Sequence, residues 1–351
     1  MRLVGFEDLS GAELHAWRTM RAGDPRLDSP YFDPAFAAAV HASGAPVTVA
    51  LDGRGPELTS LMACHRDRSV LRPVGWPGAD FQGPVSAPGA VFEPLELLVD
   101  GVRAVEFDHW LLPCPEVEPW VEARAGSPYV EVSGGLDGYL GRASKSGRDN
   151  MGQARRRTAR AERELGPVRF EAQSSDREAL GWLVERKREQ YAATGARDHF
   201  AAADRRALLE LLLATHEPGC EGLLSTLHFG DTLVAAHFGI RSRTVLHWWF
   251  PVYDPAYAGL APGWILLREL ATAAPGLGLE RIDLGRGDDE YKRRARTGEV
   301  EVAAGAVTGT AAGRVRYQAR RAAIGAAKAS PLAPALRRVV HAQRRRRDPV
   351  A

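Results

Sequence analysis

Residues 223–252 contain three apolar segments separated by two short polar turns. The segments are residues 223–229, 232–240 and 244–252, and the turns are Gly230-Asp231 and residues 241–243. Turns of this kind join antiparallel neighbours. A helix pattern follows over residues 264–274, and then a short strand that ends at Asp283-Leu284-Gly285. We predict an antiparallel meander, a crossover helix and a further strand, which is the order of a layered α/β domain.

The start of the predicted helix is rich in glycine. Its residues are Gly259-Leu260-Ala261-Pro262-Gly263. A helix N-terminus presents free backbone N–H groups, which suit a phosphate or an oxyanion. Pro262 removes one of these donors. The segment therefore indicates either an anion-binding position or a helix start whose proline and glycine serve backbone geometry alone.

This order of elements resembles the core of the GNAT acyltransferase fold. The more specific likeness is carried by Tyr253-Asp254-Pro255, Pro262-Gly263-Trp264, Asp283-Leu284-Gly285, Gly287-Asp288, Tyr291-Lys292 and the earlier segments 29–34, 78–84, 148–166 and 187–195. Together they resemble the cellulose-biosynthesis-associated acetyltransferase-like proteins, which are similar to the Fem aminoacyl transferases of cell-wall synthesis. The resemblance runs from about residue 29 to residue 305. It implies an α/β (α+β layered) protein with tandem GNAT-like halves, each a mostly antiparallel sheet flanked by helices.

We predict the halves at residues 1–130 and 131–313, followed by a basic tail at 314–351 that is helical or partly disordered. In the first half, helices are predicted at 11–21, 34–42, 92–102 and 117–125, and strands at 47–51, 58–65, 104–112 and 129–132. In the second half, helices are predicted at 136–165, with a kink near Gly147, at 176–194 and at 198–216.

The charge of the chain is divided between its body and its tail. Residues 314–347 hold 11 Arg and Lys and no acid, so residues 1–313, with 35 basic and 43 acidic residues, carry a balance of −8. RNA, an anionic membrane surface or the acidic body are the alternative partners of such a tail. The chain has no run of 18 apolar residues, no secretory segment at its start and three widely separated cysteines. These features predict a cytoplasmic protein without a transmembrane segment.

Candidate catalytic residues lie at the end of the predicted core. By the resemblance, Lys292 contacts the donor or an anionic part of the acceptor. A lysine beside a glycine-rich turn can stabilise an oxyanion, and Tyr291 can give a proton to a leaving group. Asp288 can orient Lys292 or an acceptor amine. His247, on the third meander strand, is a candidate general base for the acceptor amine. The alternatives are a solvated charge cluster and a hydrogen-bonded core histidine.

Further residues are predicted to bind the substrates. Asp80 and Gln82 lie in a Pro/Gly-rich loop, where they bind the acceptor or serve as turn residues. Trp248 is predicted as pocket wall, and Gly259, Gly263 and Trp264 as donor-binding residues. No metal site is predicted, because no set of Cys, His and carboxylate residues has ligand spacing.

The sequence thus predicts a GNAT-type N-acyltransferase in which an amine attacks an acyl thioester directly. The donor would be acyl-CoA or a carrier-bound acyl group, and the acceptor a small molecule or a precursor of cell wall or polysaccharide. One alternative is a Fem-like transferase that uses aminoacyl-tRNA, because the loop before the helix lacks the arginine that GNAT enzymes usually have. The other is a non-catalytic GNAT-fold binding module in envelope or polysaccharide biosynthesis.

Overall fold

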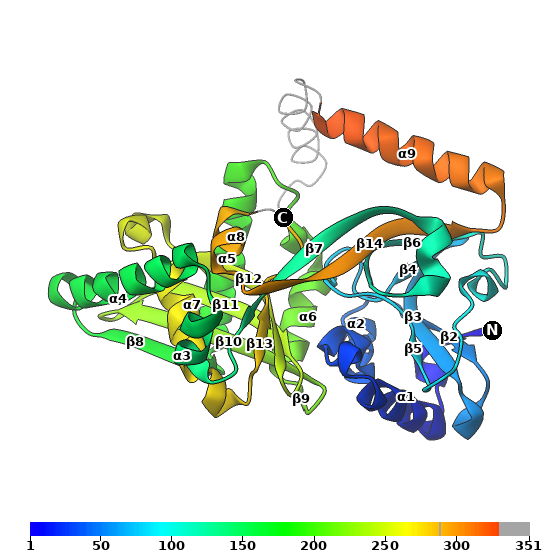
Figure 1. Ribbon diagram of the computed structural model, residues 1–351, viewed down its shortest axis with the longest axis horizontal. Helices are drawn as coiled ribbons and strands as arrows, with labels where there is room; N and C mark the ends of the chain where they lie inside the picture. Colours follow the sequence, from blue (N-terminus) through cyan, green and yellow to red (C-terminus); the bar gives the residue numbers. More distant parts are fainter. Residues whose placement is uncertain (288, 330–351) are drawn as a thin grey trace, which may run out of the picture.

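The structure is a computed structural model that describes residues 1–287 and 289–329, and the strands of this part form one mixed sheet (Figure 1). Its strand order is β1 (Arg2–Gly5), β2 (Thr48–Asp52), β3 (Ser60–Asp67), β4 (Val70–Pro73), β6 (Ala104–Leu111), β14 (Gly298–Thr308), β7 (Val121–Glu131), β13 (Arg281–Asp283), β12 (Val245–Tyr253), β11 (Thr232–Arg241), β10 (Cys220–Phe229) and β8 (Val168–Ser174). Two short strands pair at its side, β5 (Val85–Ser86) with β3 and β9 (His216–Glu217) with β10.

Each half of the sheet repeats one pattern, which confirms the tandem architecture. In the second half, β10, β11 and β12 form the predicted antiparallel meander, and β13 then pairs with β12 in parallel. In the first half, β2, β3 and β4 form a meander, and β6 pairs with β4 in parallel. A parallel pair needs a crossover connection. Helix α7 (Pro262–Ala273) makes the crossover in the second half, whereas residues 74–103 make it in the first half with only β5 and a 3₁₀ turn.

Strands β7 and β14 join the halves. They run as a long two-stranded ribbon between the two parts of the molecule (Figure 1). β14 pairs with β6 on its other side, and β7 pairs with β13. Strand β14, the last strand of the described residues, therefore returns to the first half. The boundaries at residues 130 and 313 stay predictions.

The α-helices of the described residues flank this sheet. They are α1 (Gly11–Gly23), α2 (Pro34–Ala42), α3 (Gly135–Arg142), α4 (Lys145–Leu165), α5 (Arg177–Thr194), α6 (Ala203–Leu213), α7, α8 (Glu290–Ala295) and α9 (Ala311–Ala329). The predicted single helix at 136–165 is two helices, because the Ser144 side chain accepts a hydrogen bond from the Gly147 amide and caps a new helix.

Two predicted helices of the first half are wrong. Residues 92–102 contain only a 3₁₀ turn at Pro94–Leu97, and residues 117–125 begin in a 3₁₀ helix at Pro115–Trp120 and continue into β7. Prolines interrupt both segments. Pairing of β7 with β14, which is distant in the sequence, decides the conformation of the second segment.

The basic tail is helical as far as the structure describes it. Helix α9 follows β14 and contacts it, and Arg321 lies 3.6 Å from Glu122 of β7. Residues 330–351 lie outside the described residues. Within residues 1–287 and 289–329, no helix is long and apolar enough to cross a membrane.

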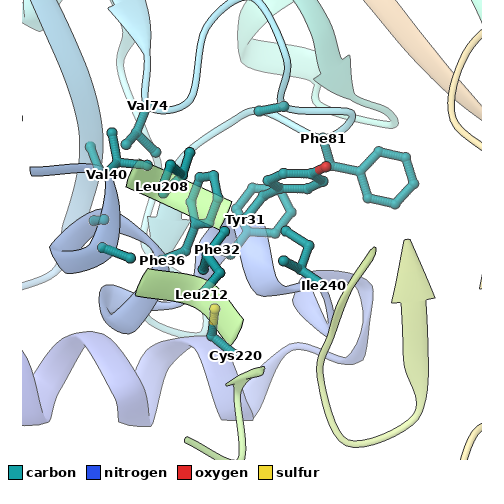
Figure 2. Close-up of a cluster of buried hydrophobic side chains, with 14 of the residues drawn as sticks. Tyr31, Phe32, Phe36, Val40, Val74, Phe81, Leu208, Leu212, Cys220 and Ile240 are labelled. Carbon is teal, nitrogen blue, oxygen red and sulfur yellow. The ribbon is translucent and has the colours of Figure 1, made fainter. Parts of the chain in front are cut away.

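The two halves share a hydrophobic core (Figure 2). Tyr31, Phe36 and Phe81 of the first half pack with Leu212 and Ile240 of the second, and all five side chains are buried. The loop that holds Phe81 thus reaches across to the second half.

Candidate active site

A large cavity opens where the pairing of two parallel strands ends. β12 and β13 pair only over Val245–His247 and Arg281–Asp283, and β12 then continues to Tyr253 while the other chain turns away. A cavity of about 860 Å³ lies in this opening, between β12, α5, the start of α7 and residues 284–292. This volume suits a small-molecule ligand.

A β-bulge shapes one wall of the cavity. Phe238 pairs with Phe250 and Ile240 with His247, so that Trp248 and Trp249 together face the single residue Gly239. Both tryptophans line the cavity. Trp248 also stacks on the buried His237 ring, with 3.9 Å between centroids.

Lys292 and Tyr291 of α8 line the cavity. The buried Lys292 ammonium donates to the carbonyl oxygens of Gly285 (3.1 Å) and Arg286 (3.2 Å) and lies 3.4 Å from a carboxylate oxygen of Asp289. Burial raises the pKa of Tyr291 above its usual value, so its hydroxyl is protonated at neutral pH and can donate a proton.

Asp80 comes from the first half but lines the cavity of the second. Its side chain is 17% exposed and accepts a hydrogen bond from the Tyr31 hydroxyl at 3.4 Å. Gly285 lies against it, because a Cβ at Gly285 would come within 2.9 Å of Asp80 Oδ1. Burial raises the pKa of Asp80, which makes its carboxylate a stronger base than an exposed one.

His247 lies behind Asp80 and not on the cavity wall. It is fully buried, and the rings of Tyr31 and Phe81 lie 4.7 Å and 5.1 Å from its own. Its Nε2 is 2.9 Å from the Ser29 hydroxyl, and its Nδ1 is 3.9 Å from Asp80 Oδ2. Burial holds the pKa of His247 well below its usual value, so the ring is neutral. His247 can therefore act on a substrate only through Asp80.

Asp283 completes this buried network, although the sequence did not single it out as a site residue. Its Oδ1 accepts hydrogen bonds from the Ser127 hydroxyl and the Gly285 amide, both at 3.0 Å, and lies 4.0 Å from His247 Nδ1. Burial, and then the charge of Asp80, raise the pKa of Asp283 to about 7. The signal in the sequence was the segment Asp283-Leu284-Gly285, which places a carboxylate at the end of a buried strand.

Lys187 of α5 is the second residue that sequence reasoning missed. It lines the cavity, donates a hydrogen bond to the Pro251 carbonyl at 3.1 Å, and lies 5.6 Å from the centre of the Tyr191 ring. Burial, and then the charge of Lys292, lower the pKa of Lys187 to about 8. Its charged neighbours on α5 make the segment look like a solvated helix face, which hides it in the sequence.

Besides His247, three predicted residues do not line the cavity or are not described. Gln82 is buried and forms hydrogen bonds to residues of β6. Its Oε1 accepts from the backbone amides of Asp108 and His109, and its Nε2 donates to Asp108 Oδ1. Gly259 is exposed and is not part of the wall. Asp288 lies outside the described residues.

The start of α7 fits a single anionic contact. The preceding residue, Ala261, is in the left-handed region at φ 48°, and no side chain caps the helix. The Trp264 amide bonds to the Ala261 carbonyl at 3.0 Å, and Pro262 has no amide hydrogen. Within the described residues the Gly263 amide has no partner, and Gly263 and Trp264 line the cavity. One free amide at the positive end of a helix can bind an oxyanion or one phosphate oxygen.

Elsewhere in the described part of the chain, a second cavity of about 440 Å³ lies in the first half beside Trp110, and no predicted site residue lines it. Residues 1–287 and 289–329 contain no group of three or more His, Cys, Asp or Glu side chains placed to hold a metal ion.

Solved structures share this fold at low sequence identity. The C-terminal domain (DUF2156) of a putative lysylphosphatidylglycerol synthetase from Agrobacterium fabrum is similar with a TM-score of 0.56, 12% identity and coverage of 88% of this chain and 96% of that chain. FemX is similar with a TM-score of 0.56, 10% identity and coverage of 86% and 97%. A tandem GNAT protein from the clavulanic acid biosynthesis pathway is similar with a TM-score of 0.51, 10% identity and coverage of 88% and 98%.

The sequence comparisons address the second half. No curated protein sequence matches the chain. Residues 148–293 match the family model described as an acetyltransferase (GNAT) domain. This match includes the meander, α7 and Lys292, whereas the cellulose-biosynthesis-associated branch stays a prediction. Residues 148–293 are therefore similar to a GNAT acetyltransferase domain, and the chain shares its fold with FemX and a tandem GNAT protein.

Proposed function

We propose that the chain is an N-acyltransferase that moves an acyl group from a thioester to an amine. The observation that carries the proposal is the cavity between the diverging β12 and β13, which brings Asp80, Tyr291 and Lys292 together with the start of α7. Asp80 comes from the first half of the chain, so both halves contribute to this one cavity. Such convergence is expected of an enzyme and not of a degenerate binding module.

A thioester supplies an activated carbonyl carbon that an amine can attack directly. The Asp80 carboxylate accepts a proton from the acceptor ammonium, and its raised pKa favours that transfer. The Gly263 amide, at the positive end of α7, stabilises the negative charge that develops on the carbonyl oxygen. Tyr291, which is protonated at neutral pH, donates a proton to the departing sulfur. His247 and Ser29 act as positioning residues that hold the Asp80 wall in place.

The Fem-like alternative, with aminoacyl-tRNA as donor, is favoured by one surface. Helix α4 exposes Arg155, Arg156, Arg160 and Arg163, and of these Arg160 pairs with Glu164 at 2.8 Å. A row of exposed arginines can follow the phosphates of a nucleic acid. Pro262 also favours aminoacyl-tRNA over acyl-CoA, because it leaves few backbone amides at the start of α7 to bind a pyrophosphate.

Thiol release from acetyl-CoA in the presence of a panel of amines tests the proposal. We expect release that depends on one class of amine and that falls about 100-fold in Asp80→Asn, the scale of losing a general base. Lys145→Ala, which changes an exposed residue of α4, should match the unmodified protein. Equal release from Asp80→Asn and the unmodified protein would remove Asp80 from the reaction.

A further inference from the structure

Lysine is rare in this chain, and two of its four lysines line the main cavity. Only four of the 46 basic residues are lysines, namely Lys145, Lys187, Lys292 and Lys328. Lys187 and Lys292 both line the main cavity, from different helices. Lysine differs from arginine in presenting a compact charge that can approach one anionic oxygen closely and that can lose its proton.

The two ammonium groups are poorly compensated. Among the described residues, Lys292 has one carboxylate partner, Asp289, at 3.4 Å. Lys187 donates to a backbone carbonyl and, in the described part of the chain, has no carboxylate within 4 Å. The neighbouring Arg186 is itself paired with Glu189 and Asp254. Repulsion from the Lys292 ammonium contributes to the lowered pKa of Lys187. A bound anion would therefore offset the repulsion between the two ammonium groups.

We propose that Lys187 and Lys292 together bind a carboxylate or phosphate group of the amine acceptor. The inference rests on the proposed function, which makes Asp80 the residue that receives the acceptor's proton. Both side chains lie against Gly285: the Lys292 ammonium donates to its carbonyl oxygen, and Asp80 Oδ1 would lie only 2.9 Å from a Cβ at this position. The acceptor's anion and its amine must therefore lie close together, as they do in an amino acid or in a small amino sugar phosphate.

The donor end of the cavity lies elsewhere on β12. Gly263, at the start of α7, faces Tyr253, where a Cβ would meet the ring at 3.8 Å, whereas Lys187 bonds to Pro251. Tyr253 is the last residue of β12, and Pro251 lies closer to the bulge at Trp248 and Trp249. This separation assigns the lysine pair to the acceptor and the start of α7 to the donor.

The small number of lysines makes the test direct. Protein labelled with ¹³C at the lysine ε-carbons gives four signals, and variants assign them. Inorganic phosphate, acetate and glycine serve as probes, and methylamine serves as an amine without an anion. We expect phosphate, acetate and glycine to raise the pKa of Lys187 from about 8 by about one unit, while methylamine does not. The exposed Lys145 is the internal control.

Three variants show whether Lys187 binds the anion or serves only the packing of the fold. Lys187→Met should weaken the phosphate response of the Lys292 signal about tenfold or more, on the scale of one charged hydrogen bond. Lys187→Arg should retain the response, and Lys145→Met should leave it unchanged. Thermal unfolding of each variant checks that it is folded.

The proposal would be overturned if the signals of Lys187 and Lys292 responded to the anions no more than that of Lys145. An unchanged phosphate response of the Lys292 signal in Lys187→Met would also overturn it. Acetyl-CoA and S-acetylpantetheine, which lacks the nucleotide phosphates, distinguish the sources of the anion. A Lys187 shift with acetyl-CoA but with none of the small anions would assign the pair to the donor and overturn the acceptor assignment. Calorimetry with acetyl-CoA on Lys187→Met reports donor binding separately, so failure of the lysine pair is distinguishable from failure of the proposed function.

Discussion

Replacement of Asp283 by Asn should change how stability depends on pH. Asp283 is fully buried, and its pKa is raised from 3.8 to about 7 in the folded protein. Because the folded pKa lies above the unfolded one, the protonated carboxyl favours folding at low pH, and this contribution is lost as the pH rises to about 7. From pH 5 up to the folded pKa of about 7, the free energy of unfolding falls by about 1.4 kcal/mol per pH unit. This amounts to about 3 kcal/mol between pH 5 and pH 8.5.

Asparagine keeps the shape of the side chain and does not titrate. Its carbonyl oxygen can accept the hydrogen bonds from Ser127 and Gly285 that Oδ1 of Asp283 accepts now. Urea unfolding followed by tryptophan fluorescence, at pH 5 and at pH 8.5, gives the free energy of unfolding of both proteins. Relative to the unmodified protein, Asp283→Asn should gain about 3 kcal/mol from the lower to the higher pH. A difference between the two proteins that is the same at both pH values would refute the buried, proton-binding Asp283.

Three further predictions address the site and the tail. Lys292→Ala should lower kcat/KM about 10- to 100-fold, on the scale of one charged hydrogen bond to the acceptor's anion, and a kcat/KM within a few-fold of normal would remove Lys292 from the site. Ser29→Ala should cost about 1–3 kcal/mol in urea unfolding, because it leaves His247 Nε2 buried without its partner, and unchanged stability would contradict that hydrogen bond. Deletion of residues 315–351 should leave the fold intact and abolish salt-sensitive binding to heparin, whereas loss of folded protein would show that the tail belongs to the core.

The parts of the fold that local signals determine were predictable from the sequence. The meander β10–β12 and helix α7 follow from short polar turns and from a Pro/Gly helix start, and helix α2 has the predicted bounds Pro34–Ala42. The first part of β7 was mistaken for a helix, only its end was predicted as a strand at 129–132, and β14 was not predicted at all. About half of the chain lies between these two paired strands, so only tertiary contacts select their conformation.

The sequence predicted some residues of the site and missed others. Lys292, Tyr291 and Gly263 follow a strand or begin a helix, where short-range patterns place binding groups. The position of His247 behind Asp80 depends on a loop of the first half that crosses to the second, and strand alternation cannot show which side of a strand that loop covers. Lys187 was missed because it lies in a run of charged residues, 185–189, and only its hydrogen bond to the Pro251 carbonyl distinguishes it.

The central claim is that the cavity beside α7 binds an acyl thioester. Isothermal titration calorimetry with acetyl-CoA tests it most directly, with aminoacyl-tRNA as the competing ligand and Gly263→Trp, which fills the cavity at the start of α7, as the control variant. The account predicts saturable binding of acetyl-CoA to the unmodified protein, a loss of that binding in Gly263→Trp, and no comparable binding of aminoacyl-tRNA. Binding of aminoacyl-tRNA alone would contradict the thioester donor, and binding of neither ligand would contradict the acyl-transfer function itself.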